Sequence, residues 1–211
     1  MFFQIKAIKA DVFAWLGEIQ NTLTQQERNE VEDNDIDNED DENFFNVRGV
    51  GSRITRNKMK ELILNNMTDF ASMNAEKTVL LCDQWFEDIY IRVAEDLIQH
   101  SQSKELAYKF LEAVIHIHEP DIEKEYKQAV LMNQNQKQIS DKYELVILKL
   151  LEILAERKVK NYAKLIVEFV SKVYVPILPA LEICKQKKAV EAQAVLQKRK
   201  GDYKQAIDLY L

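Results

Sequence analysis

From residue 57 to residue 211, apolar side chains recur at steps of three and four positions with few interruptions. This spacing places them on one face of an α-helix, so the sequence predicts a succession of amphipathic helices. The 211 residues include only 4 glycines and 3 prolines, where ordinary usage would supply about four times as many. Because tight turns and Gly-rich phosphate loops need glycine, the composition disfavours most β-rich folds and Gly-loop nucleotide-binding folds.

The predicted helices are joined by short polar segments. One longer helix is expected over residues 75–99, the next is expected to end before Pro120, and another to cover residues 121–132. Short connections between such helices are typical of antiparallel hairpins, and hairpins that bury their faces against each other form an α-solenoid. We therefore predict an all-α fold of stacked antiparallel helix hairpins over residues 57–211, with a single globular bundle as the alternative.

Two segments precede this region. Residues 1–23 are predicted to form an N-terminal amphipathic helix, and residues 24–56 lose the apolar period. Between residues 27 and 42, ten acidic residues stand against one basic residue. Mutual repulsion and little apolar area to bury predict a flexible acidic linker here. The tract carries a net charge of −9, so the remainder of the chain, whose total is −6, is close to neutral at +3.

Charge, hydropathy and cysteine content restrict the function classes. The near-neutral remainder lacks the basic stripe that nucleic-acid binding needs. No run of 18 apolar residues occurs, so no membrane span is expected. Cys82 and Cys184 form no CxxC motif, and the expected state is two reduced thiols in the cytosol. Cys82 lies in an apolar helix face and is expected to be buried and unreactive.

Motifs for metal, nucleotide or nucleophilic chemistry are incomplete. A calcium loop in the acidic tract would need Gly at its sixth position and Glu at its twelfth, where the chain has Asn38 and Phe44. His116 and His118 are two positions apart and so do not share a helix face. Residues 49–52 form a Gly-rich fragment without the Lys-Ser/Thr pair of a phosphate loop. We therefore predict no catalytic, cofactor-binding or metal-binding residues, and the protein is not expected to be an enzyme.

The most specific stretch is residues 180–211, ALEICKQKKAVEAQAVLQKRKGDYKQAIDLYL. Gly201 follows the last periodic position of its helix, where a left-handed residue is favoured, and Asp202 can cap the next helix. Ala192 and Ala206 are small where two hairpin helices would approach closely. The residues predicted to pack between repeats are Leu181, Cys184, Ala192, Leu196, Gly201, Asp202, Ala206 and Leu209.

This string of 32 residues resembles the helical repeat shared by clathrin heavy chain and the large vacuolar-protein-sorting tethering subunits. Within that group it is most similar to the C-terminal solenoid of the vacuolar protein sorting-associated protein 8 family, which supplies a subunit of the CORVET tethering complex. The helix over residues 165–170, followed by Pro176, also suits that repeat, whereas residues 57–160 resemble it only in architecture. The matching positions are Leu181, Cys184, Val190, Glu191, Ala192, Ala194, Leu196, Gly201, Asp202, Ala206 and Leu209.

The resemblance implies a non-enzymatic scaffold subunit of an endosomal or vacuolar vesicle-tethering complex, which acts in vesicle-mediated protein transport and membrane fusion. Its implied partners are the other subunits of the complex and a Rab-type small GTPase, with no nucleic acid and no cofactor. Its implied location is the cytoplasm, with peripheral attachment to endosomal or vacuolar membranes through those partners. The apolar period of the last helix also predicts that the helix, and the solenoid, continue beyond Leu211.

Other functions remain open at this point. A tetratricopeptide-like peptide-binding adaptor would show several matched repeats of about 34 residues, and a single Gly-Asp-Tyr-x-x-Ala turn is found. A trafficking subunit of the clathrin or HOPS type would carry the same kind of repeat. A small all-helical enzyme would bring titratable residues together in a pocket, and the sequence offers no such set.

Overall fold

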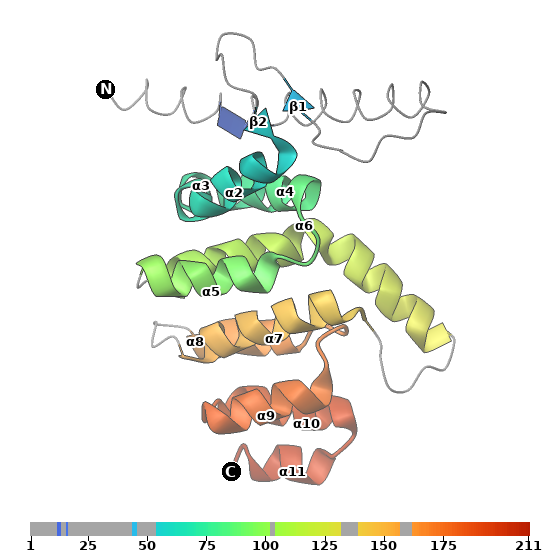
Figure 1. The fold of residues 1–211 in the computed structure, drawn as a ribbon. Coiled ribbons are helices and arrows are strands. Elements are labelled where there is room, and N and C mark those ends of the chain that lie inside the picture. Colours follow the sequence, from blue (N-terminus) through green and yellow to red (C-terminus); the bar gives the residue numbers. More distant parts are fainter. Residues whose placement is uncertain are drawn as a thin grey trace. The chain divides into compact units, whose positions relative to one another are not determined.

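The computed structural model describes residues 12–13, 16, 44–45, 54–101, 104–131, 139–156 and 162–211. Apart from two strands of two residues each, the regular structure in these ranges is helical, which confirms the predicted all-α class (Figure 1). The chain divides into two compact units, residues 1–87 and residues 88–211. The prediction of one continuous repeat array over residues 57–211 stays a prediction, because this range is shared between the two units.

The described part of unit 1 (residues 1–87) is built mainly from α2 (Arg56–Asn65), α3 (Met67–Met73) and α4 (Ala75–Trp85). Asn74 separates the last two helices, and its side chain caps α4 by accepting a hydrogen bond from the Lys77 backbone N–H at 2.9 Å. Ile63 and Val79 are fully buried, and Leu16 is 1% exposed. Leu16 belongs to the helix predicted over residues 1–23, most of which lies outside the described residues.

Two short strands fall inside the range that was predicted to be an acidic linker, residues 24–56. β1 (Phe44–Phe45) pairs antiparallel with β2 (Ile54–Thr55), with Phe44 opposite Thr55 and Phe45 opposite Ile54. Such brief strands leave no alternating pattern to detect in the sequence. The rest of the range, apart from Arg56 at the start of α2, lies outside the described residues.

Unit 2 (residues 88–211) contains seven helices in its described part, and helices close in sequence pack on each other (Figure 1). α5 packs on α6, α6 on α7, α7 on α8 and α9, and α10 on α8, α9 and α11. The helices are α5 (Tyr90–Ser101), α6 (Lys104–Leu131), α7 (Asp141–Glu156), α8 (Tyr162–Val170), α9 (Ile177–Gln186), α10 (Val190–Lys200) and α11 (Tyr203–Asp208).

The sequence pattern of α7 explains its central place in this order. The helix is apolar on nearly every side, which predicts neighbours in more than one direction, and it contacts α5, α6, α8 and α9. Leu145 is an exception at 55% exposed. The buried side chains of α7 are Tyr143, Val146, Ile147, Leu150, Leu151, Ile153 and Leu154.

The prediction of a single helix over residues 75–99 is wrong. α4 ends at Trp85, α5 begins at Tyr90, and Asp88 between them adopts a left-handed conformation with φ of 50°. Aspartate is one of the few residues besides glycine that enter this region at modest cost. The break therefore has neither the glycine nor the proline that would reveal it in the sequence.

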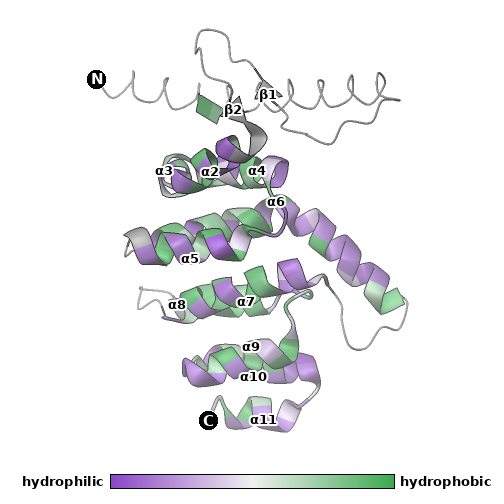
Figure 2. Cartoon of the chain, in the orientation of Figure 1, coloured by the Kyte–Doolittle hydropathy of each residue, from purple (hydrophilic) through white to green (hydrophobic). Residues whose placement is uncertain are grey.

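The predicted helix end before Pro120 is also wrong, because α6 continues through this residue to Leu131. An internal proline removes one backbone hydrogen bond and crowds the preceding turn, at a cost of about 3 kcal/mol. Figure 1 shows α6 changing direction about halfway along its length, and Figure 2 shows its second half as largely hydrophilic. Complete burial of Ile122, just after the proline, favours the continued helix.

Candidate functional site

The residues predicted to pack between repeats lie on α9, α10, α11 and the turn between the last two helices. Leu181, Cys184, Ala192, Leu196 and Ala206 are all buried, with at most 6% of their surface exposed. Asp202 and Leu209 are half-buried, and Gly201 is exposed. The five buried residues thus lie on α9, α10 and α11, of which α10 contacts the other two, whereas Gly201 has open space around its Cα.

The turn after α10 has the geometry that its sequence indicates. Gly201 is left-handed, with φ of 90°, and its N–H donates to the Lys198 carbonyl at 3.1 Å. The N–H of Asp202 donates to the Gln197 carbonyl at 2.9 Å, which completes a Schellman motif. The Asp202 carboxylate then accepts a hydrogen bond from the Gln205 N–H at 3.1 Å and caps α11. Both features agree with the sequence prediction.

The same motif ends α9, where the sequence gives no such signal. Lys188 is left-handed, with φ of 58°. Its N–H donates to the Lys185 carbonyl at 3.1 Å, and the Ala189 N–H donates to the Cys184 carbonyl at 2.9 Å. A lysine pays a steric cost in this conformation that glycine does not. This turn was missed because sequence reasoning recognises it by glycine or asparagine.

We expect the Lys188→Gly substitution to raise the free energy of unfolding by about 1 kcal/mol, because it relieves the left-handed strain. The matched change is Gly201→Ala, which introduces the same strain into the equivalent turn. No atom lies within 4 Å of the added Cβ there, so a loss of about 1 kcal/mol would reflect backbone conformation alone. Urea unfolding of both variants measures the effects, and equal signs for the two changes would contradict this account.

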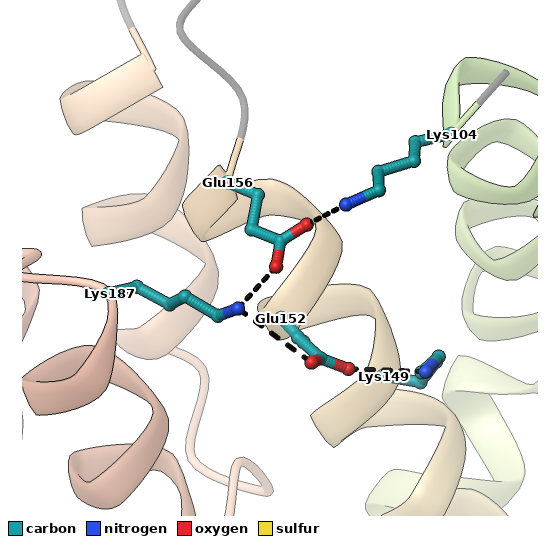
Figure 3. Close-up of polar contacts among 5 residues, drawn as sticks. All are labelled: Lys104, Lys149, Glu152, Glu156 and Lys187. Carbon is teal, nitrogen blue, oxygen red and sulfur yellow. Dashed lines mark hydrogen bonds and ion pairs between the residues drawn. The ribbon is translucent and has the colours of Figure 1, made fainter.

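A cluster of charged side chains joins the start of α6, the end of α7 and the residue after α9 (Figure 3). Glu156, at the end of α7, receives hydrogen bonds from Lys104 at the start of α6 and from Lys187 just after α9. Lys187 Nζ also lies 3.8 Å from the Glu152 carboxylate, which lies 3.2 Å from Lys149 Nζ. The Glu156 side chain is 27% exposed, so these ion pairs lie at the edge of the helix contacts. We call this cluster of five residues the Glu156 cluster.

The two lysines lower the pKa of Glu156, chiefly through the hydrogen bond from Lys104 and then that from Lys187. Because the folded-state pKa lies below the unfolded value, the cluster stabilises the fold above that unfolded pKa. The stabilisation is lost as the pH falls through the lowered value. The hydrogen bond to Glu156 correspondingly raises the pKa of Lys187.

We expect the Glu156→Gln substitution to lower the free energy of unfolding by about 1 kcal/mol at pH 7, since two partly exposed ion pairs lose their charge. The difference from the parent chain should vanish in strong acid, where the parent carboxylate is also neutral. Urea unfolding across the acid range tests this. Glu95→Gln, an exposed change within α5, is the control and should have almost no effect; a difference that persists in strong acid would contradict the electrostatic explanation.

A second polar contact links α6 to the segment between α8 and α9. Glu119 accepts hydrogen bonds from Lys172 Nζ at 2.6 Å and from the Tyr174 hydroxyl at 2.8 Å. These bonds, first that of Lys172, lower the pKa of Glu119. Burial of Tyr174, followed by its hydrogen bond to Glu119, raises the pKa of the tyrosine. Glu119 precedes Pro120, so this contact fixes α6 at the point where the helix carries its proline.

Arg199 of α10 binds the end of α8 through its guanidinium group. Nη1 donates to the Val170 carbonyl at 2.7 Å, and Nη2 donates to the carbonyls of Val173 at 2.7 Å and Val175 at 3.1 Å. The last carbonyls of a helix lack partners within the helix. Arg199 thus supplies donors to the last residue of α8 and to two residues of the segment that follows it.

The histidines do not form a metal site in the described residues. His116 is exposed, whereas His118 Nε2 lies 3.0 Å from the Tyr90 hydroxyl and its ring lies 5.5 Å from that of Tyr143. Among the residues described, no group of three or more His, Cys, Asp or Glu side chains is placed to hold a metal ion. His118 instead contributes to the contact between α5, α6 and α7.

Both cysteines are free and buried, as the sequence predicts. Burial, with a further contribution from Asp83, raises the pKa of Cys82 to about 12, and burial raises that of Cys184 to about 11. Since the thiolate is the reactive form, both thiols are poor nucleophiles at neutral pH.

A shallow hollow of about 140 Å³ lies in unit 1. It is lined by Phe13, Lys77, Leu80, Leu81 and Gln84. Lys77 Nζ lies 5.7 Å from the centre of the Phe13 ring, so the lysine already has an aromatic contact there. The hollow contains no pair of acid and base side chains that would support catalysis.

The polar clusters of unit 2 described above connect helices to one another. None of the described helices combines the length and hydropathy needed to cross a bilayer. Comparisons with known proteins identify no matching family model, no matching curated protein and no matching solved structure.

Proposed function

We propose that this chain is a non-enzymatic scaffold whose helix hairpins stack as an α-solenoid. The observation that carries the proposal is the order of packing in unit 2, in which α5 contacts α6, α6 contacts α7, α7 contacts α9, and α10 contacts both α8 and α11. A chain that buries its helix faces against successive neighbours has a long side surface available for partners. A closed bundle would instead bring helices distant in sequence around one centre.

Within this scaffold class, the proposed role is that of a subunit of an endosomal or vacuolar vesicle-tethering complex, acting in vesicle transport and membrane fusion. The support for this assignment is the resemblance of residues 180–211 to the helical repeat of the vacuolar protein sorting-associated protein 8 family. The partners would be other subunits of the complex and a Rab-type small GTPase. Attachment to the membrane would be peripheral and would depend on those partners.

The proposed mechanism is mechanical. Adjacent helix pairs share apolar contacts and are joined at their edges by ion pairs, such as the Glu156 cluster. Exposed ion pairs are weak individually and reform after small displacements. Such a stack can bend while it keeps its hydrophobic contacts, which suits a subunit that holds two membranes at a variable distance.

Co-purification with the tagged chain from native cells, followed by mass spectrometry, tests the proposed role. Recovery of the shared core subunits of a tethering complex is the expected result. Recovery of chaperones or a metabolic enzyme alone would reject it. A bait that carries Leu196→Ala is the control, because a destabilised chain recruits chaperones and thereby identifies those that bind unfolded protein.

A further inference from the structure

We propose that Ser171 is a phosphorylation site, at which a phosphate group on the serine oxygen becomes the counter-ion of Arg199. This inference concerns a covalent modification and does not depend on the proposed scaffold role. It follows from the exposure of Ser171, from the position of the Arg199 guanidinium beside it, and from the lack of an acidic partner for that arginine among the described residues.

Ser171 is accessible to an enzyme. It follows the last residue of α8 and lies in the connection between α8 and α9, where the backbone is not helical. The residue is exposed, and its hydroxyl donates to the Val167 carbonyl at 2.7 Å. Connections of this kind are where modifying enzymes reach a folded chain. The connection precedes α9, α10 and α11, so helices that follow residue 211 in a stack would pack on α11 and not here.

The guanidinium of Arg199 lies beside Ser171 because it binds carbonyls on both sides of the serine. Nη1 donates to the Val170 carbonyl at 2.7 Å, and Nη2 donates to the Val173 carbonyl at 2.7 Å. The carbonyl carbon of Val170 is bonded to the Ser171 nitrogen, so Nη1 lies within about one peptide unit of the serine backbone. Even with the third bond, to Val175, the guanidinium keeps N–H groups that can donate to phosphate oxygens.

No acidic side chain neutralises Arg199 in the part of the chain that the structure describes. Burial lowers the pKa of Arg199, and the opposing effect comes from Tyr126 rather than from a carboxylate. Glu119, which contacts the same connection, is bonded to Lys172 and Tyr174. The end of α8 supplies only about half a negative charge, so part of the positive charge of the half-buried guanidinium remains for an anion.

The reaction is transfer of the terminal phosphoryl group of ATP by a protein kinase. The bond between Ser171 Oγ and phosphorus forms as the bond from that phosphorus to ADP breaks, and the hydroxyl proton passes to the catalytic base of the kinase. The product carries a charge of about −1.5 to −2 at pH 7. Alone, this charge is unfavourable beside the negative end of α8. With Arg199 present, the phosphate instead connects α8 more firmly to α10.

Phosphopeptide mass spectrometry of the chain isolated from native cells, with phosphatases inhibited, tests whether the modification occurs. A phosphate on Ser171 is the expected result. Recovery of the peptide that contains Ser171 only in its unmodified form would overturn the proposal.

Titration followed by phosphorus NMR tests the contact with Arg199 in the 211-residue chain, with phosphoserine installed at residue 171 during translation. The arginine should hold the second pKa of this phosphate below that of phosphoserine installed at residue 72. Ser72 is the matched control, because it is also exposed near a helix end and its hydroxyl donates to a backbone carbonyl at 2.8 Å. The last turn of its helix holds no basic residue. Equal values at the two sites would overturn the proposal.

Thermal unfolding tests whether Arg199 determines the effect of the phosphate on the fold. In the parent chain, phosphoserine at residue 171 should raise the Tm by about 2 to 4 °C. In the Arg199→Met chain, compared with its own unmodified form, the same phosphate should lower the Tm, because only the negative end of α8 then acts on it. A rise of equal size in both chains would overturn the proposal. The NMR comparison needs no substitution of Arg199, so it holds even if that variant folds poorly.

Discussion

Replacing Leu196 with alanine is expected to lower the free energy of unfolding by about 3 to 4 kcal/mol, one of the largest effects that a single substitution in this chain can have. Leu196 is completely buried in α10, which contacts α8, α9 and α11. The substitution removes buried methyl groups and leaves a cavity that a helix held on several sides cannot easily close. Urea unfolding followed by circular dichroism measures the loss.

Leu178→Ala is the matched control, because it makes the same chemical change on the adjacent helix α9 at a residue that is 66% exposed. This variant should change the stability by less than about 0.5 kcal/mol. Equal losses in the two variants would mean that burial within the contacts of α10 does not determine their stability.

Replacing Arg199 with methionine is expected to cost about 3 kcal/mol. The methionine keeps the apolar stem, but the carbonyls of Val170, Val173 and Val175 lose their donor, and unsatisfied acceptors near a buried helix end are expensive. Val170 and Val175 are almost completely buried, at 0% and 1% exposed, so water cannot readily replace the guanidinium there. The same unfolding measurement reports the loss.

Two further variants distinguish the loss of these hydrogen bonds from the loss of a positive charge in this region. Lys198→Met removes a neighbouring exposed charge and should have an effect within about 0.5 kcal/mol. Arg199→Lys should lose an intermediate amount, because an ammonium group lacks the planar fork that reaches several carbonyls at once. A wild-type stability for Arg199→Met would show that water satisfies these carbonyls as well as the arginine does.

Local features of the fold were predictable where a residue type has one dominant structural use. Gly201 and Asp202 mark a helix end and a helix start by themselves, and both have the expected conformation. Asp88 and Lys188 also adopt a left-handed conformation and end a helix or follow its end. Neither is a glycine, so the sequence did not indicate these two turns. Pro120 led to the wrong prediction of a helix end. The helix continues through it because tertiary contacts, which the sequence does not reveal, outweigh the cost of a proline inside a helix.

The polar clusters could not be predicted because they depend on which helices become neighbours. Glu156 is 52 positions from Lys104 and 31 positions from Lys187, and no spacing rule relates such residues. Glu119 and Tyr174 are 55 positions apart. In the sequence, nothing distinguishes these residues from other polar residues on a helix surface. Their partners are set only by the way α6, α7, α8 and α9 pack.

Native-state hydrogen exchange on the parent chain and on the Leu196→Ala variant most directly tests the proposal that unit 2 is a stack stabilised by neighbouring helices. If each helix depends on its neighbours, exchange should accelerate in α8, α9, α10 and α11, while the amides of α5 and of the first half of α6 keep their protection. An equal acceleration in every helix from α5 to α11 would show a single cooperative core. That result would contradict the stacked scaffold and favour a closed bundle.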